Sequence, residues 1–278
     1  MRGIDPGGRV AVVTGGARGI GLATAAALHA AGARVAIGDL DGAPTAQTAE
    51  RLGVHGGPLD VTDPASVEAF LDDVESRLGP VSIWVNNAGI MPIGPVLAQD
   101  DAVVRRAVNV NVLGVMNGAR AAARRMVTRG DGRIVNVASI AGRIPAPGMV
   151  VYSGTKFAVV GFGDALDAEL AARGVRVSTV LPSFTRTALI SGTAPGPLTR
   201  PIPPEQVAAT VLRVLTRGRR QAVVPRRLST GSAVWQLFPR PAARGLRRTL
   251  GLDTVFLDVD SGRADYDARI AGDAQPSE

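Results

Sequence analysis

The chain has 278 residues, of which 46% are apolar and 20% are charged, and its formal net charge is +7. This apolar content is enough for a large core and too high for a disordered chain, and the length suits one α/β domain. Because there is no cysteine, disulfides, thiolate metal sites and thiol catalysis are excluded. The N-terminus does not read as a signal peptide and no run of about 18 apolar residues predicts a membrane span, so we expect a cytoplasmic protein.

Short apolar runs alternate with helical patterns along the chain. Strands are predicted at residues 10–14, 34–38, 82–85, 133–138, 175–181 and 221–224, and helices at residues 20–31, 64–78, 101–128, 151–173 and 205–217. This alternation indicates βαβ units and a parallel sheet that is buried on both faces. We therefore predict a Rossmann-like doubly wound α/β fold with helices on both faces. It forms a single domain, residues 1–225 with a substrate loop at 188–204, and a C-terminal extension, residues 226–278, packs on or flanks that domain.

A glycine-rich loop follows the first predicted strand and leads into the first predicted helix. Gly15, Gly19 and Gly21 have the spacing G-x-x-x-G-x-G, and Arg18 and Ile20 lie between them. Glycines permit a tight turn and let a pyrophosphate approach the helix N-terminus, where unpaired N–H groups point outward. The strand before the loop, the helix after it and an acid about 20 residues further on therefore predict a dinucleotide-binding site.

The acid is Asp39, at the end of the second predicted strand. A carboxylate at this place hydrogen-bonds the adenosine ribose and repels a 2′-phosphate, by roughly 4 kcal/mol for each unit charge pair about 4 Å apart. Arg18 has the opposite effect, because its guanidinium is able to meet that phosphate. We weigh Asp39 more heavily, so NAD is the preferred cofactor and NADP is the alternative.

Tyr152 and Lys156 are spaced i and i+4, which places them on one face of a predicted helix. A free tyrosine is a poor base at neutral pH because its pKa is near 10. An ammonium about 4 Å away in a partly buried site supplies roughly the 4 kcal/mol that lowers this pKa to about 7. Taken alone, the spacing also fits an ordinary surface pair. However, Lys156 is the only lysine among 31 basic residues, which suggests that this position requires an ammonium.

Further motifs end predicted strands: Ser139 lies 13 residues before Tyr152, and Asn87 stands in the run Asn86-Asn87-Ala88-Gly89. With the glycine-rich loop, and in this order and spacing, they resemble the short-chain dehydrogenase/reductase family over roughly residues 8–190. The resemblance implies an NAD(P)-dependent oxidoreductase that transfers a hydride between the nicotinamide and an alcohol or carbonyl carbon. It also implies a homodimer or homotetramer.

The resemblance further implies a role for each matching residue. Tyr152 would be the general acid/base, and Lys156 would lower its pKa and hold the nicotinamide ribose hydroxyls. Ser139 would hydrogen-bond the reacting oxygen, and Asn111 would position a water in the proton relay. The other implied cofactor contacts are Asp60, Val61, Asn87, Ala88, Gly89, Pro182 and Thr187.

Two features depart from the family pattern. Ser183 stands where a glycine usually follows the proline, and the aspartate-and-double-glycine ending of the acyl-carrier-protein reductases is absent. The second departure speaks against a housekeeping fatty-acid role and against the tetramer interface of those reductases.

The loops expected around the site are apolar and carry few charges. Their apolar side chains are Met91, Ile93, Ile144, Met149, Leu189, Ile190 and Leu198. If these side chains face inward, they form an apolar pocket, so we expect a lipophilic secondary alcohol or ketone as substrate. The alternative interpretation is that half of these side chains only pack the loops.

The end of the chain is rich in arginine, with ten arginines and no acid between Arg213 and Arg248. This segment is either a solvated face or a peripheral contact with an anionic membrane. No nucleic-acid recognition module is visible, and the two histidines show no metal-ligand spacing. Two other functions remain open: an NADPH-dependent ketone reductase with the same site, and a non-catalytic redox sensor on the same fold.

Overall fold

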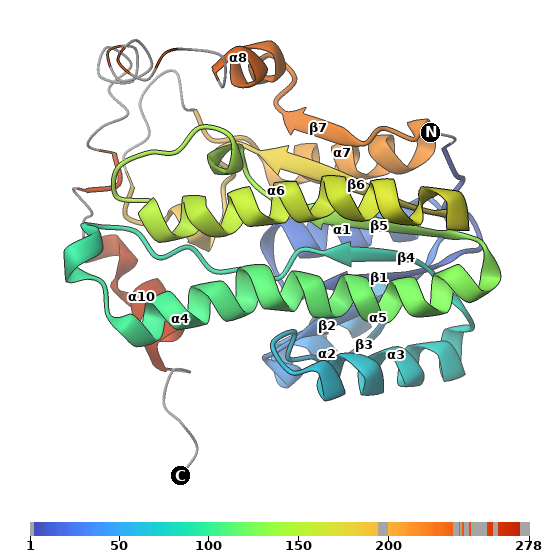
Figure 1. The fold of residues 1–278 in the computed structure, drawn as a ribbon. Helices are drawn as coiled ribbons and strands as arrows, with labels where there is room; N and C mark the ends of the chain where they lie inside the picture. Colours follow the sequence, from blue (N-terminus) through green and yellow to red (C-terminus); the bar gives the residue numbers. More distant parts are fainter. Residues whose placement is uncertain are drawn as a thin grey trace.

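The computed structural model describes residues 3–193, 200–235, 239, 241, 245, 255–257 and 261–272. Seven parallel strands form one sheet in the order β3-β2-β1-β4-β5-β6-β7 (Figure 1). The strands are β1 (Val10–Thr14), β2 (Arg34–Asp39), β3 (His55–Pro58), β4 (Val81–Asn86), β5 (Gly132–Val137), β6 (Val175–Pro182) and β7 (Gln221–Val224). The central strands are almost wholly buried, which is why they appear in the sequence as continuous apolar runs.

Helices cover both faces of the sheet, and each face has its own apolar core (Figure 1). On one face pack α1 (Gly19–Ala30), α2 (Gly42–Leu52) and α7 (Pro204–Arg217). On the other pack α3 (Pro64–Leu78), α5 (Gly114–Arg129) and α6 (Val150–Leu170). The Rossmann-like doubly wound fold expected from the sequence is confirmed. The strand order reverses between β1 and β4, and in such sheets ligands bind beyond the carboxyl ends of the strands at this point.

The predicted helix at residues 101–128 is interrupted in the structure. α4 (Asp101–Val108) passes into a π-helical segment, η2 (Asn109–Leu113), and then into α5. The interruption coincides with Asn111, whose fully buried side chain bonds the main chain of Ile90. A single wide turn of this kind is frequent at functional sites and leaves no mark in the hydrophobic periodicity.

Two elements near β2 were not predicted, namely α2 and β3. The four residues of β3 include two glycines and a proline, so they carry no β-propensity signal. They are a strand because they pair with β2 from Ala36 to Asp39. Tertiary pairing decided this element, not local preference.

The described part of the C-terminal extension includes α8 (Leu228–Trp235), residues 255–257, η7 (Ser261–Arg263) and α10 (Ala264–Gly272). α8 follows β7 at the top of the view, whereas α10 lies at the left, beside α4 (Figure 1). Within the described residues, no helix is long and apolar enough to cross a bilayer.

Candidate active site

A cavity of about 800 Å³ lies beyond the carboxyl ends of the strands. Asp39, the last residue of β2, and Asp60, just after β3, line one part of it, and Tyr152 and Lys156 of α6 line another. Its position matches the ligand crevice expected where strand order reverses, and its size is that of a small-molecule or cofactor site. The fold therefore brings the predicted adenosine end and the predicted catalytic end into one continuous space.

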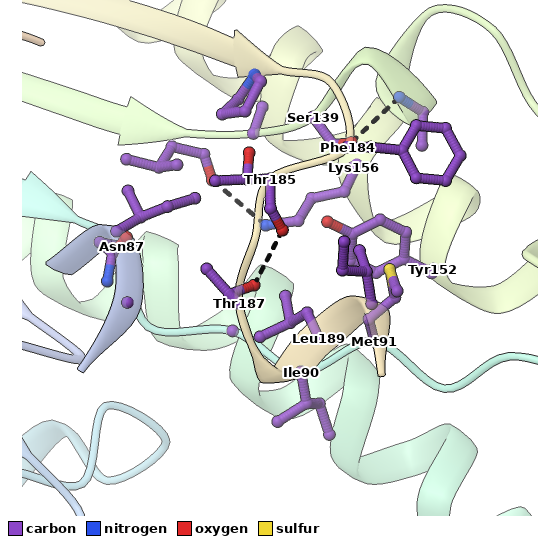
Figure 2. A pocket seen from close by; sticks show the side chains of 18 of the residues that line it. Asn87, Ile90, Met91, Ser139, Tyr152, Lys156, Phe184, Thr185, Thr187 and Leu189 are labelled. Atoms are coloured by element: carbon purple, nitrogen blue, oxygen red, sulfur yellow. Dashed lines mark hydrogen bonds between the residues drawn. The ribbon is translucent and has the colours of Figure 1, made fainter. Parts of the chain in front are cut away.

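Ser139, Tyr152 and Lys156 meet at the catalytic end (Figure 2). Tyr152 and Lys156 share a face of α6 and are 6% and 4% exposed. Ser139 follows β5, caps the short helix η3 (Ile140–Gly142) by accepting from the Ala141 N–H at 3.1 Å, and is hydrogen-bonded to Tyr152. The Lys156 ammonium lies 5.6 Å from the centre of the Tyr152 ring and donates to the Val137 carbonyl at 3.2 Å.

Burial dominates the proton affinities of this pair. It raises the pKa of Tyr152 above its usual value near 10, and the hydrogen bond from Ser139 opposes this rise. It lowers the pKa of Lys156 from 10.5 to about 8, because an apolar surrounding disfavours the ammonium. The expected lowering of the Tyr152 pKa is therefore not supplied by the folded chain. The ammonium bonds the Val137 carbonyl instead, and desolvation of the phenolate is the larger effect.

Asn111 lies behind this group and is absent from the cavity wall. Its Oδ1 accepts from the Ile90 N–H at 2.9 Å, and its Nδ2 donates to the Ile90 carbonyl at 2.8 Å and to Thr155 Oγ1 at 3.1 Å. Gly89 lies between Asn111 and Lys156, since a Cβ there would be 3.1 Å from Asn111 Oδ1 and 3.6 Å from Lys156 Nζ. The Asn111 amide thus holds the chain after β4 close to the lysine.

The glycine-rich loop is shaped for close approach of its own backbone. Gly15 and Gly19 have φ of +63° and +56°, where glycine is favoured. A Cβ on Gly21 would lie 2.0 Å from the Gly15 carbonyl oxygen. The first turn of α1 has no side-chain cap, so its N–H groups are suited to an anion. Of the predicted loop residues, Gly15, Arg18, Gly19 and Ile20 line the cavity, and Gly21 packs behind them.

Asp39 is held at the end of β2 by two backbone donors. Its Oδ2 accepts from the Ala17 N–H at 3.1 Å, and its Oδ1 accepts from the Leu40 N–H at 2.9 Å. Arg18 forms an ion pair with Asp41, a residue that the sequence analysis did not single out. The carboxylate of Asp41 therefore partly neutralises the one cation that was expected to favour a 2′-phosphate.

The remaining predicted cofactor contacts surround the same cavity. Its walls include Asp60, Val61, Asn87, Ala88, Gly89, Pro182 and Thr187. Asn87 Nδ2 donates to the Thr14 and Gly15 carbonyls at 2.9 and 3.0 Å, so it joins the end of β4 to the glycine-rich loop. Thr187 approaches Gly19, where a Cβ would lie 3.2 Å from its methyl carbon. Ser183 donates its N–H to the Val224 carbonyl at 2.8 Å, which places it between β6 and β7.

The side of the cavity next to Tyr152 is apolar. Of the predicted substrate-loop residues, Met91, Ile144, Met149, Leu189 and Ile190 line it. Ile93 packs against the same apolar cluster, and Leu198 lies outside the described residues. Phe184 and Phe256 also line this wall and were not predicted. Phe256 lies in an apolar island of the C-terminal extension, and no local pattern connects it to a helix 100 residues earlier.

No group of three or more metal-ligating side chains occurs in the part of the chain that the structure describes.

Comparison with known proteins identifies the family. The family described as short chain dehydrogenase matches residues 9–196, so the chain belongs to the short-chain dehydrogenase family, as the motifs predicted. The oxidoreductase EphD of Mycobacterium tuberculosis is 40% identical over 193 residues, which cover 66% of this chain and 33% of EphD. The chain therefore spans about a third of the length of that relative. The 3-oxoacyl-[acyl-carrier-protein] reductase FabG of Escherichia coli is 37% identical over 183 residues, 65% of this chain and 75% of FabG.

Solved structures agree with this assignment. A short-chain dehydrogenase/reductase from Burkholderia phymatum in complex with NAD is 25% identical, with a TM-score of 0.77 over 88% of this chain and 96% of that chain. A gluconate 5-dehydrogenase from Burkholderia cenocepacia in complex with NADP and tartrate is 28% identical, with a TM-score of 0.74 over 81% and 98% of the two chains. These relatives include one complex with each nicotinamide cofactor, so they leave the preference of this chain to its own residues.

Proposed function

We propose that the protein transfers a hydride between a nicotinamide cofactor and the carbinol or carbonyl carbon of a lipophilic secondary alcohol or ketone. One observation carries the proposal. Tyr152, Ser139 and Lys156 converge at the apolar part of a cavity whose other part holds the glycine-rich loop and Asp39.

The residues present fit a dinucleotide. The uncapped first turn of α1 suits the pyrophosphate, and Asp39 suits the adenosine ribose hydroxyls. Lys156 suits the hydroxyls of the nicotinamide ribose, because its ammonium faces the cavity between Gly89 and Tyr152. When bound, the nicotinamide supplies or accepts the hydride.

The chain itself handles the proton. The Tyr152 hydroxyl gives its proton to the substrate oxygen during ketone reduction and takes one during alcohol oxidation. The Ser139 hydroxyl, hydrogen-bonded to Tyr152, steadies that oxygen and opposes the rise in the Tyr152 pKa that burial causes. The wall formed by Met91, Met149 and Phe256 excludes water from the reacting carbon.

The function is tested by assaying lipophilic secondary alcohols and ketones with NAD⁺, NADH, NADP⁺ and NADPH. Turnover of at least one pair supports the proposal. The direction and cofactor of the fastest reaction separate an NAD-dependent dehydrogenase from an NADPH-dependent ketone reductase. Nicotinamide binding without turnover of any compound would instead support a redox sensor, against which the presence of Ser139, Tyr152 and Lys156 in one cavity already argues.

We expect the cofactor preference to depend on Asp39 and Asp41. The protein should bind NADH more tightly than NADPH. Asp39→Ala should reduce the ratio of the NADPH dissociation constant to the NADH dissociation constant by about tenfold or more, because it removes a ribose acceptor and a charge that repels a 2′-phosphate. Asp41→Ala should also improve NADP(H) binding, since it releases Arg18 from its ion pair. Dissociation constants for NADH and NADPH measure both effects, with Glu50→Ala on the exposed side of α2 as the control. Tighter NADPH than NADH binding by the parent protein would contradict the prediction.

A peripheral membrane contact of the arginine-rich segment is a separate proposal. Arg226, Arg227 and Val234 are exposed around α8, whereas Arg220 is already paired with Asp167. We expect the protein to sediment with vesicles that contain anionic lipid at low salt and to be released as salt rises, because exposed charges are screened. Arg240, Arg244, Arg247 and Arg248 lie outside the described residues. Equal recovery with neutral and anionic vesicles would favour a solvated face.

A further inference from the structure

The C-terminal extension returns to the active-site cavity. Phe256 lines the cavity and stacks on Phe184, with ring centroids 5.4 Å apart and planes inclined by 10°. α10 lies beside α4 (Figure 1), and η7 directly precedes and contacts α10. The surroundings of Tyr152 are therefore completed by residues about 100 positions further along the chain.

Arg263 is the central side chain of this contact. It is 1% exposed, although a buried guanidinium is costly unless it is fully hydrogen-bonded. Its Nη1 donates to the carbonyls of Leu189 and Ser191 at 2.7 and 3.2 Å, and its Nη2 donates to the carbonyl of Met91. Its Nε is paired with Asp267 at 2.9 Å. One guanidinium thus bonds the main chain of two separate loops.

Tyr266 completes the contact with the loop after β4. Its hydroxyl accepts from the Met91 N–H at 2.9 Å, and the Arg263 guanidinium lies 4.4 Å from the centre of its ring. Both main-chain polar groups of Met91 are therefore bonded by the extension, the N–H by Tyr266 and the carbonyl by Arg263. The Met91 side chain contacts the same apolar cluster as Tyr152.

A third loop touches the extension at Gly148. This glycine has φ of +76°, and a Cβ there would lie 2.3 Å from the Phe256 carbonyl oxygen. The Gly148 carbonyl accepts from the Gly94 N–H at 2.9 Å, which links this loop to the loop after β4. The loops after β4, β5 and β6, which together carry the apolar wall, are each in contact with Phe256, Arg263 or Tyr266.

We propose that Arg263, assisted by Tyr266, is a positioning residue that fixes the loops after β4 and β6 and thereby sets which substrates fit beside Tyr152. The planar fork of arginine donates in two directions at once, which a lysine ammonium on a flexible stem does not reproduce. Release of these bonds leaves the Met91 and Leu189 loops without their shared anchor and loosens the apolar wall. The part of this proposal that concerns substrate rests on the proposed function, whereas the anchoring of the loops is a property of the folded chain.

Hydrogen exchange of the full chain tests the anchoring without any substrate. In Arg263→Lys and Tyr266→Phe, we expect amides in residues 90–94 to exchange at least about tenfold faster, because local opening loses its opposing bonds. Arg263→Lys should also affect residues 186–191, whereas Tyr266→Phe should leave them near the parent rate. Arg217→Lys, at an exposed position of α7, is the matched control and should change neither. Parent-like exchange of both loops in Arg263→Lys would overturn the proposal, whether or not the protein turns over any compound.

Steady-state kinetics test the effect on substrate. Arg263→Lys should raise KM for a bulky lipophilic ketone by at least about tenfold, while kcat/KM for butan-2-one stays within about threefold. NADH affinity should remain that of the parent. Equal losses for both ketones, or a loss of NADH binding, would indicate a general structural defect and contradict the specificity role. A parent protein that reduces no ketone contradicts the proposed function, and the exchange result then still decides whether Arg263 fixes the loops.

Discussion

Tyr152→Phe is expected to lower turnover by about a thousandfold, within the range that positioned acid–base groups contribute. The variant keeps the buried ring and removes only the hydroxyl, which is hydrogen-bonded to Ser139 at the catalytic end of the cavity. NADH binding and thermal unfolding should stay close to those of the parent, because the ring packing is retained. Single-turnover measurements of hydride transfer give the sharpest comparison.

The pH dependence provides a second readout for Tyr152. Alcohol oxidation requires the phenolate, and burial raises the pKa of Tyr152. Oxidation by the parent should therefore rise about tenfold per pH unit from neutral pH up to at least about pH 10, because the phenolate fraction keeps increasing below the raised pKa. The residual activity of Tyr152→Phe should lack this rise. A phenylalanine variant with parental turnover or with the parental pH profile would show that another group carries the proton.

Lys156→Arg is expected to lower turnover at least about 100-fold with folding intact, because misplacement by about 1 Å is enough for such a loss. The site is tight: Lys156 is 4% exposed, and a Cβ on Gly142 would lie 2.6 Å from its carbonyl oxygen. A guanidinium is wider than an ammonium and has a fixed fork of donors. It therefore displaces the ribose or moves the charge away from Tyr152. A folded arginine variant within about threefold of parental turnover would refute the role of this lysine.

Lys156→Met separates the chemical role from a structural one. In the folded chain the pKa of Lys156 is about 8 rather than 10.5, so below pH 8 the protein carries the full cost of a buried charge, about 3 kcal/mol. Between these two pKa values the unfolded chain binds the proton and the folded chain does not, so stability rises with pH there. Loss of the bond to Val137 offsets about 1 kcal/mol. Lys156→Met should therefore be inactive yet about 2 kcal/mol more stable at pH 7, a gain of several degrees in Tm.

The same comparison at pH 10 provides the check. At pH 10 Lys156 is mostly neutral in the folded parent, so most of the cost of the buried charge is gone. The difference in Tm between Lys156→Met and the parent should therefore shrink. A methionine variant that is less stable than the parent at pH 7 would show that the ammonium holds the fold together. Its loss of activity would then say little about catalysis.

Most of the candidate catalytic and cofactor-binding residues could be predicted from the sequence, because they lie in short local motifs. Tyr152 and Lys156 are four residues apart on one helix, and the glycines of the first loop are within seven residues of one another. The parallel sheet was predictable for a related reason, since a strand buried on both faces must be apolar at nearly every position. These patterns place the predicted catalytic and cofactor residues at the carboxyl edge of the sheet before any tertiary contact is known.

Other features depend on contacts between distant residues. From the sequence, Arg18 was expected to favour a 2′-phosphate, but in the structure it is paired with Asp41, 23 residues further along the chain. β3 is a strand only through its register with β2, and the π-helical turn at Asn111 follows from bonds to Ile90.

The C-terminal extension is the clearest case. Arg263 bonds the Met91 carbonyl across 172 positions of sequence, and no periodicity or motif links the two. Sequence by itself determined the class of chemistry, because acid–base groups and a phosphate-binding loop need particular residue types at short spacing. Tertiary structure alone decided how the apolar side of the cavity is closed, because the buried guanidinium finds its carbonyl acceptors only after the loops that follow β4 and β6 have been brought together.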